Sequence, residues 1–251
     1  MFPIVCMMKA PLSLLPLPLG GALALFIGCY SFEFDFVLAD LWYHGDQFGW
    51  KHHFWLDTVL HRGVRSVHLL LYLMLLVGYG WLQWGKVGRG PQVQHFTRAL
   101  GVLLLSVTSC LALVALLKHL IPMDCPWDLR RYGGAQPFIG LFSAWPVGRA
   151  PNACFPAGHA SIGYAWLGLY FFCQQLYPRY ARKALALSLG FGVLFGAAQQ
   201  LRGAHFISHD IATAALCWIV TCLIAQWCGI HLNPKPALPS ATAGQHADVA
   251  R

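Results

Sequence analysis

Long apolar stretches separated by shorter polar ones dominate this chain. A helix that crosses a bilayer needs about 20 mostly apolar residues. Six stretches meet or approach that length, and they predict helices at about 11–30, 66–84, 98–120, 160–177, 184–201 and 211–230. The pattern therefore predicts an all-α, polytopic integral membrane protein with about six transmembrane helices.

The connections between these helices differ in length and charge. Segments 85–97 and 178–183 carry basic residues and no acidic ones, so the positive-inside rule assigns both to the cytoplasm. Both termini are then cytoplasmic as well. Segments 31–65, 121–159 and 202–210 are expected on the outer side. The first of these is rich in aromatic residues and is predicted to lie along the membrane interface.

Composition strengthens the membrane interpretation. Charged residues make up 10% of the chain, against about 25% in soluble domains. The net charge of +8 comes without a dense basic cluster, so no nucleic-acid partner is expected. We expect three regions: an N-terminal membrane region with two helices and an interfacial loop (1–97), a helical core with the catalytic residues (98–230) and a disordered, Pro/Ala/Ser-rich tail (231–251).

Three stretches on the predicted outer side share one kind of chemistry. They are residues 118–134, 154–161 and 199–210. Their cations and imidazoles include Lys118, Arg130, Arg131, Arg202, His159, His205 and His209. Arginines in an outer loop oppose the topology signal, and an anionic ligand would explain them.

This combination suits phosphoryl transfer. A neutral imidazole can attack phosphorus while a second, protonated one donates to the leaving oxygen. Cations stabilise the charge on the remaining oxygens. The aspartates in these stretches, Asp124, Asp128 and Asp210, are scattered, so the sequence favours a mechanism without a metal or other cofactor.

Two short motifs and a preceding lysine carry a family resemblance. The sequence has Lys118 followed by Pro126, then Pro-Ala-Gly-His ending at His159, then Gly-Ala-His-Phe around His205. This order resembles the type 2 phosphatidic acid phosphatases, membrane lipid phosphatases related to the vanadium haloperoxidases. Their pattern is K-x6-R-P, P-S-G-H and S-R-x5-H-x3-D, and the resemblance covers about residues 98–230.

The resemblance implies a role for each matching residue. His205 would be the nucleophile that forms a phosphohistidine, and His159 would be the general acid. Lys118 would bind phosphate, and Gly158 would allow the backbone to approach a phosphate oxygen.

The chain departs from the family pattern at both arginine positions, which hold Cys125 and Gln199. Arg131 and Arg202 are nearby cations that we expect to take over phosphate binding, with Arg130 as a further candidate. The family spacing gives the residue that orients His205 as His209, whereas a carboxylate would suit that task and Asp210 is next in sequence. Both assignments stay open. An inactive relative is the alternative to a divergent enzyme.

Cys125 and Cys154 share the polar outer loop, whereas the other cysteines lie in or beside apolar stretches. We hypothesise that these two form a disulfide, as an oxidising compartment would permit.

The sequence therefore predicts a metal-independent phosphatase in a bacterial inner membrane, with its site facing the periplasm. Its expected partners are a phosphorylated lipid substrate and membrane lipids. A lipid phosphotransferase with the same site and a non-catalytic protein that binds anionic head groups are the alternatives. A haloperoxidase is disfavoured, because its vanadate-binding arginines have no counterparts at the usual positions.

Overall fold

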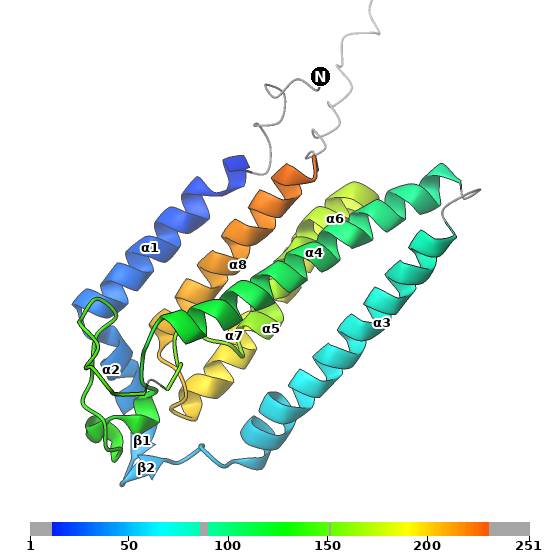
Figure 1. Ribbon diagram of the computed structural model, residues 1–251. Helices are drawn as coiled ribbons and strands as arrows, with labels where there is room; N and C mark the ends of the chain where they lie inside the picture. Colours follow the sequence, from blue (N-terminus) through cyan, green and yellow to red (C-terminus); the bar gives the residue numbers. More distant parts are fainter. Residues whose placement is uncertain (1–11, 86–89, 151, 231–251) are drawn as a thin grey trace, which may run out of the picture.

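A computed structural model describes residues 12–85, 90–150 and 152–230, and the predicted tail lies outside these ranges. Five long helices run side by side and form most of the molecule (Figure 1). They are α1 (Pro16–Ser31), α3 (Val64–Trp84), α4 (Pro91–Leu120), α7 (Ala181–Leu201) and α8 (Ile207–Trp227). Proline opens both α1 and α4, where its fixed φ suits the first helical turn.

Short elements connect these helices. Between α1 and α3 lie α2 (Phe34–Asp40), β1 (Tyr43–His44), β2 (Gln47–Phe48) and the π-helix η3 (Trp55–Gly63). The two strands form an antiparallel pair. Between α4 and α7 lie η4 (Pro126–Asp128), η5 (Arg130–Tyr132), α5 (Ser161–Tyr164), η6 (Ala165–Gly168), α6 (Leu169–Leu176) and η7 (Pro178–Tyr180). A single 3-10 turn, η2 (Leu12–Leu14), precedes α1.

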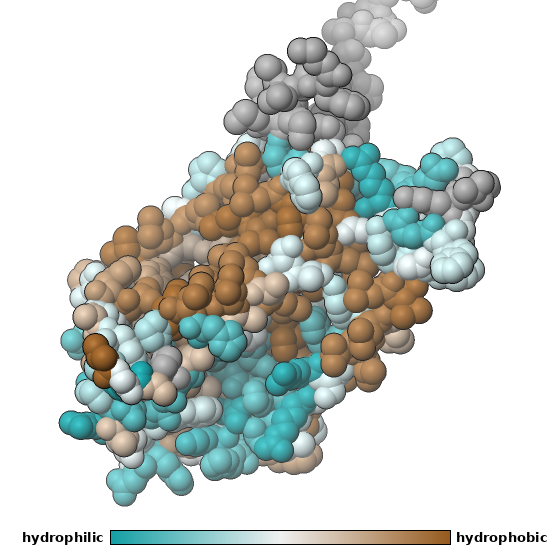
Figure 2. All heavy atoms as spheres, in the orientation of Figure 1, coloured by the Kyte–Doolittle hydropathy of each residue, from teal (hydrophilic) through white to brown (hydrophobic). Residues whose placement is uncertain are grey.

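The all-α, membrane-spanning prediction is confirmed. Within the described ranges, five helical stretches are long and apolar enough to cross a membrane. Hydrophobic side chains gather over the middle of the bundle, and hydrophilic ones gather at the end that carries α2, β1 and β2 (Figure 2). This distribution suits a protein with lipid around its middle and water at that end.

The predicted fourth helix is not one of these five. It consists of α5, η6 and α6, and most of its first half is buried. Gly163 lies so close to α7 that an added Cβ would be 2.2 Å from the backbone nitrogen of Gly192. The segment therefore packs inside the bundle, where a full lipid-facing length is not required.

The predicted second helix begins earlier than expected, at Trp55 rather than near residue 66, because η3 continues directly into α3. The sequence pattern had placed this polar stretch in an interfacial loop. The charged side chains of η3 are accommodated by ion pairs: Asp57 binds Arg62 at 2.7 Å and Arg202 at 2.6 Å.

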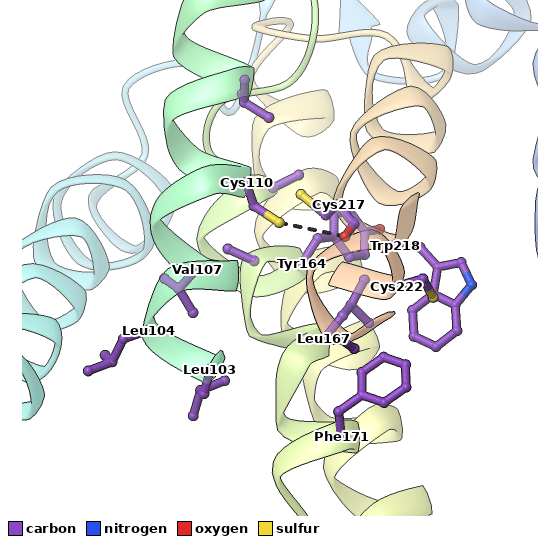
Figure 3. Packing of buried hydrophobic residues seen from close by; sticks show 14 of the residues in the cluster. Leu103, Leu104, Val107, Cys110, Tyr164, Leu167, Phe171, Cys217, Trp218 and Cys222 are labelled. Carbon is purple, nitrogen blue, oxygen red and sulfur yellow. Dashed lines mark hydrogen bonds between the residues drawn. The ribbon is translucent and has the colours of Figure 1, made fainter. Parts of the chain in front are cut away.

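The main core lies between α4, the α5–α6 segment and α8 (Figure 3). Leu103 and Val107 of α4 are buried there with Phe171 and Trp218, whose rings stack 6.1 Å apart. A second, smaller cluster joins Ala39, Phe48, Leu129, Tyr132 and Phe206. This cluster fastens the α2–β2 segment onto the outer loop and the start of α8.

Candidate functional site

A cavity of about 760 Å³ lies between α3, α4, α5 and the end of α7. Its charged and titratable lining residues come from both halves of the chain: His61, Arg65, His68, Lys118, His159 and His205. Among the described residues that line it, none is an aspartate or a glutamate. A cavity with cationic side chains, imidazoles and no carboxylate is suited to an anion.

Another part of the same cavity is apolar. Leu69 and Tyr72 of α3 face Leu111 and Val114 of α4 across it, and Ile162 of α5 completes this part of the lining. The cavity thus joins a polar region to a hydrophobic one.

His205 lies in the turn between α7 and α8, two residues before α8 begins. Its Nδ1 is 3.4 Å from Nδ1 of His209, one helical turn later. The backbone of Cys154 interacts with both imidazoles. Burial, followed by the nearby charge of Lys118, lowers the pKa of His205 well below its usual value, so its ring is neutral at pH 7.

The structure places His209, and not Asp210, against His205. The carboxylate of Asp210 accepts a hydrogen bond from Gln200 and lies against Gly196 on α7. Successive residues of a helix point about 100° apart, so only one of the two could face His205. Of the two candidates that the sequence left open, His209 is therefore the one beside His205, and the alternative, Asp210, is not.

His159 precedes α5 and is 7% exposed. Its Nε2 donates a hydrogen bond to the Leu60 carbonyl of η3 at 2.6 Å, and its ring centroid lies 4.8 Å from that of His61. A carbonyl only accepts, so Nε2 carries a hydrogen and Nδ1 is the atom that gains or loses a proton. Burial lowers the pKa of His159 to about 4, and the charges on His61, Arg202 and Arg65 act in the same direction.

Lys118, near the C-terminal end of α4, donates from Nζ to the Pro156 carbonyl at 3.2 Å. Its side chain passes close to Gly158, where an added Cβ would be 3.4 Å from Lys118 Cδ. The Lys118 side chain therefore lies within van der Waals reach of residue 158, beside the His159 turn.

Arg130 and Arg131 do not line the cavity, which corrects the prediction that they contact the bound anion. Arg131 forms a bidentate pair with Asp40 of α2, with Nη2 2.6 Å from Oδ2, and this pairing lowers the pKa of the Asp40 carboxyl. Arg130 is exposed and donates to the Ala135 carbonyl at 3.2 Å. Both arginines hold the outer loop in place.

Arg202 is not a lining residue either. It is buried, and its guanidinium donates to Asp57 at 2.6 Å, to the Lys51 carbonyl at 3.1 Å and to Gln199 Oε1 at 3.0 Å. Three partners thus hold it away from the cavity. Of Arg202 and its hydrogen-bond partner Gln199, it is Gln199 that lines the cavity.

Cys125 and Cys154 form a disulfide that also lines the cavity, with their Cα atoms 5.2 Å apart. The backbone nitrogen of Cys154 donates to the Met123 carbonyl at 3.0 Å. The half of the disulfide that contacts His205 and His209 is therefore tied to the segment that follows α4.

His61, Arg65 and His68 were not among the predicted site residues. They lie at i, i+4 and i+7, the spacing of one helix face, and Tyr72 continues the same row. The spacing is visible in the sequence. The apolar run predicts a helix only from about residue 66, so the prediction places His61 and Arg65 in the preceding loop and not on the same helix face as His68.

Comparison with known proteins agrees with the geometry. No curated protein and no solved structure matches the chain. A family profile described as the PAP2 superfamily matches residues 99–231, more than half of the 251 residues. Members of this superfamily act as phosphatases or phosphotransferases on phosphorylated substrates. The chain, with its membrane-spanning helices and its paired histidines, belongs to the PAP2 superfamily.

Proposed function

We propose that this protein is a membrane lipid phosphatase that hydrolyses a phosphate monoester or a diphosphate on a lipid. The observation that carries the proposal is that His205, His159 and Lys118 line one cavity in which the described lining residues include no carboxylate. The apolar part of the cavity, between α3 and α4, gives a lipid chain a surface to lie on while its phosphate reaches the imidazoles.

His205 is the nucleophile in this proposal. When its Nδ1 hydrogen points at His209, the Nε2 lone pair is free to attack phosphorus. A P–N bond forms as the bond between phosphorus and the leaving oxygen breaks. The lowered pKa of His205 keeps its attacking nitrogen unprotonated at neutral pH, as a nucleophile requires.

His159 is the general acid, and it donates from Nδ1 to the leaving oxygen. In the free protein its pKa of about 4 leaves the ring neutral at pH 7. A phosphate dianion beside the ring raises the pKa of His159. Substrate binding therefore favours the protonated, proton-donating form of this histidine. In the second step, water loses a proton to His159 and attacks phosphorus, which releases inorganic phosphate and regenerates His205.

Two cationic side chains balance the phosphate charge. Lys118 comes from the core, and Arg65 comes from α3. We place the protein in a bacterial inner membrane, with this site facing the periplasm.

The test is phosphate release by the purified, detergent-solubilised protein from a panel of phosphorylated lipids, with EDTA present. The panel contains phosphatidic acid, phosphatidylglycerol phosphate, undecaprenyl diphosphate and lipid A. We expect release from at least one lipid and a loss of about 1,000-fold or more in His205→Ala and about 100-fold in His159→Ala. His119→Ala is the matched control, because His119 is exposed on α4 and does not line the cavity.

A second readout separates hydrolysis from transfer. With ³²P-labelled lipid and an alkaline quench, the wild type should carry an alkali-stable, acid-labile label that His205→Ala lacks. A labelled protein that releases no phosphate would be a phosphotransferase awaiting its acceptor. Release that persists in His205→Ala would overturn the mechanism.

A further inference from the structure

We propose that the side-chain amide of Gln199 donates a hydrogen bond to a phosphate oxygen of the bound substrate, and that Arg202 is the residue that positions this amide. The assignment rests on the proposed function, because it names a further contact in the same site. It also reverses the expectation that Arg202 itself would bind the phosphate.

The geometry of the pair decides which end of the amide is available. Gln199 is 2% exposed and lines the cavity. Arg202 Nη1 donates to its Oε1 at 3.0 Å. A guanidinium has only donors, so the amide atom that faces Arg202 must be the oxygen. The NH₂ group is therefore directed away from Arg202.

Within the described residues, Nε2 of Gln199 is buried and has no hydrogen-bond partner. Buried donors are almost always satisfied in folded proteins, and an exception calls for an explanation. A phosphate oxygen in the cavity would supply the missing acceptor. That hydrogen bond would contribute to the affinity for the anion.

Arg202 is held too firmly to serve as the phosphate ligand. Its side chain is 7% exposed, and its ion pair with Asp57 is 2.6 Å long. Its Nε donates to the Lys51 carbonyl. Because a cation at Oε1 draws electron density from the amide, Arg202 also strengthens the N–H groups of Gln199 as donors.

Orthovanadate is the probe for this contact, because vanadate bound to a histidine nitrogen adopts the five-coordinate geometry of phosphorus during attack by His205. We would measure its inhibition constant, and the rise in melting temperature that it produces, for Gln199→Met and Gln199→Glu. Methionine keeps the length and removes the donor, and glutamate replaces the donor with an acceptor. We expect vanadate to bind about tenfold more weakly to the first variant and about 100-fold more weakly to the second.

The matched control is Gln226→Met. Gln226 is another glutamine with a buried, unsatisfied amide atom, near the end of α8, and it does not line the cavity. Its variant should bind vanadate within about twofold of the wild type. If Gln199→Met also stays within that limit, or if vanadate does not stabilise the wild type, the assignment is overturned.

A double-mutant cycle tests the positioning role of Arg202. Arg202→Lys keeps a cation for Asp57 and removes the separate Nη1 hydrogen bond to Gln199 Oε1. We expect Arg202→Lys to weaken vanadate binding severalfold in the wild-type background and to have no further effect in Gln199→Met. An equal effect in both backgrounds would mean that residue 202 acts on the anion directly.

The vanadate readout keeps this inference separate from the proposed function. A wild type that binds vanadate but releases no phosphate from any lipid contradicts the phosphatase proposal. In that case the melting-temperature shifts of the same variants still decide whether Gln199 contacts the anion.

Discussion

The two walls of the cavity are built differently. The wall formed by the core has nine buried residues on α4 alone, whereas none of the 21 residues of the described helix α3 is buried. The core wall holds the histidine pair and Lys118. The wall formed by η3 and α3 supplies His61, Arg65 and part of the apolar lining.

This difference indicates a division of labour. Groups that form and break bonds must be held in place, and the packed wall does this with interlocking side chains. A cation that stabilises charge tolerates more freedom, because electrostatic attraction falls off gradually with distance. A loosely covered helix beside the apolar region also suits a substrate that enters from the bilayer.

The largest expected effect is on the free energy of unfolding, when one glycine in the packed core and one on α3 are each replaced by alanine. In Gly192→Ala, the new Cβ would be 2.1 Å from the Tyr164 ring, so α5 and α7 would have to separate. We expect a loss of about 3 kcal/mol in unfolding free energy, or no folded protein. Gly78→Ala on α3 meets no atom within 4 Å and should change stability by about 1 kcal/mol or less. Thermal unfolding in detergent measures both, and equal effects would contradict the comparison.

A smaller effect is expected for the charge on the α3 wall. Arg65→Ala should lower kcat/KM by about 30-fold, because it removes one of two cationic side chains that line the cavity. Arg62→Ala removes the same charge from the adjoining helical stretch, but its side chain is 73% exposed and pairs with Asp57 outside the cavity. Its kcat/KM should stay within about twofold of the wild type. Identical losses in the two variants would indicate a general electrostatic effect.

The smallest effect is a pH dependence of stability that arises in the core wall. The folded pKa of His159 is about 4, below the usual value of 6.5, so the unfolded chain binds more protons below pH 6.5. Stability should therefore fall as pH decreases from 6.5 towards 4, by about 1 kcal/mol at pH 5.5 from this group.

His159→Gln removes this contribution. Between pH 7.5 and 5.5 the wild type should lose about 2–4 °C more in melting temperature than the variant. His119→Gln, in which an exposed imidazole is replaced, is the control and should follow the wild type. Parallel losses in the wild type and His159→Gln would show that His159 is not held neutral by burial.

The sequence predicted the parts of the molecule that depend on local pattern. Apolar runs located α7 and α8 to within four residues at each end, because a spanning helix needs a continuous apolar length. The end of α4 at Leu120 was also predicted, but α4 begins at Pro91 and not near residue 98, because its first turns carry polar residues. The order of the motifs indicated that Lys118, His159 and His205 lie together, and the structure brings them into one cavity.

Charge pairing between distant segments could not be predicted in this way. Arg131 binds Asp40, 91 residues away in sequence, and Arg202 binds Asp57, 145 residues away. Nothing in the local sequence distinguishes such an arginine from one that faces a ligand. Only the folded contacts show that both cations already have partners, and that Gln199 reaches the cavity instead.

The Asp57–Arg202 ion pair also indicates whether the segment that matches the superfamily could fold without the residues before it. Arg202 lies within residues 99–231, which match the superfamily, but its carboxylate partner comes from η3, outside that range. If the matched segment were excised, Arg202 would lose the Asp57 carboxylate and the Lys51 carbonyl, two of its three hydrogen-bond partners. The segment that carries η3 is thus no detachable accessory. An exchange of this core between relatives would succeed only if the aspartate moved with the arginine.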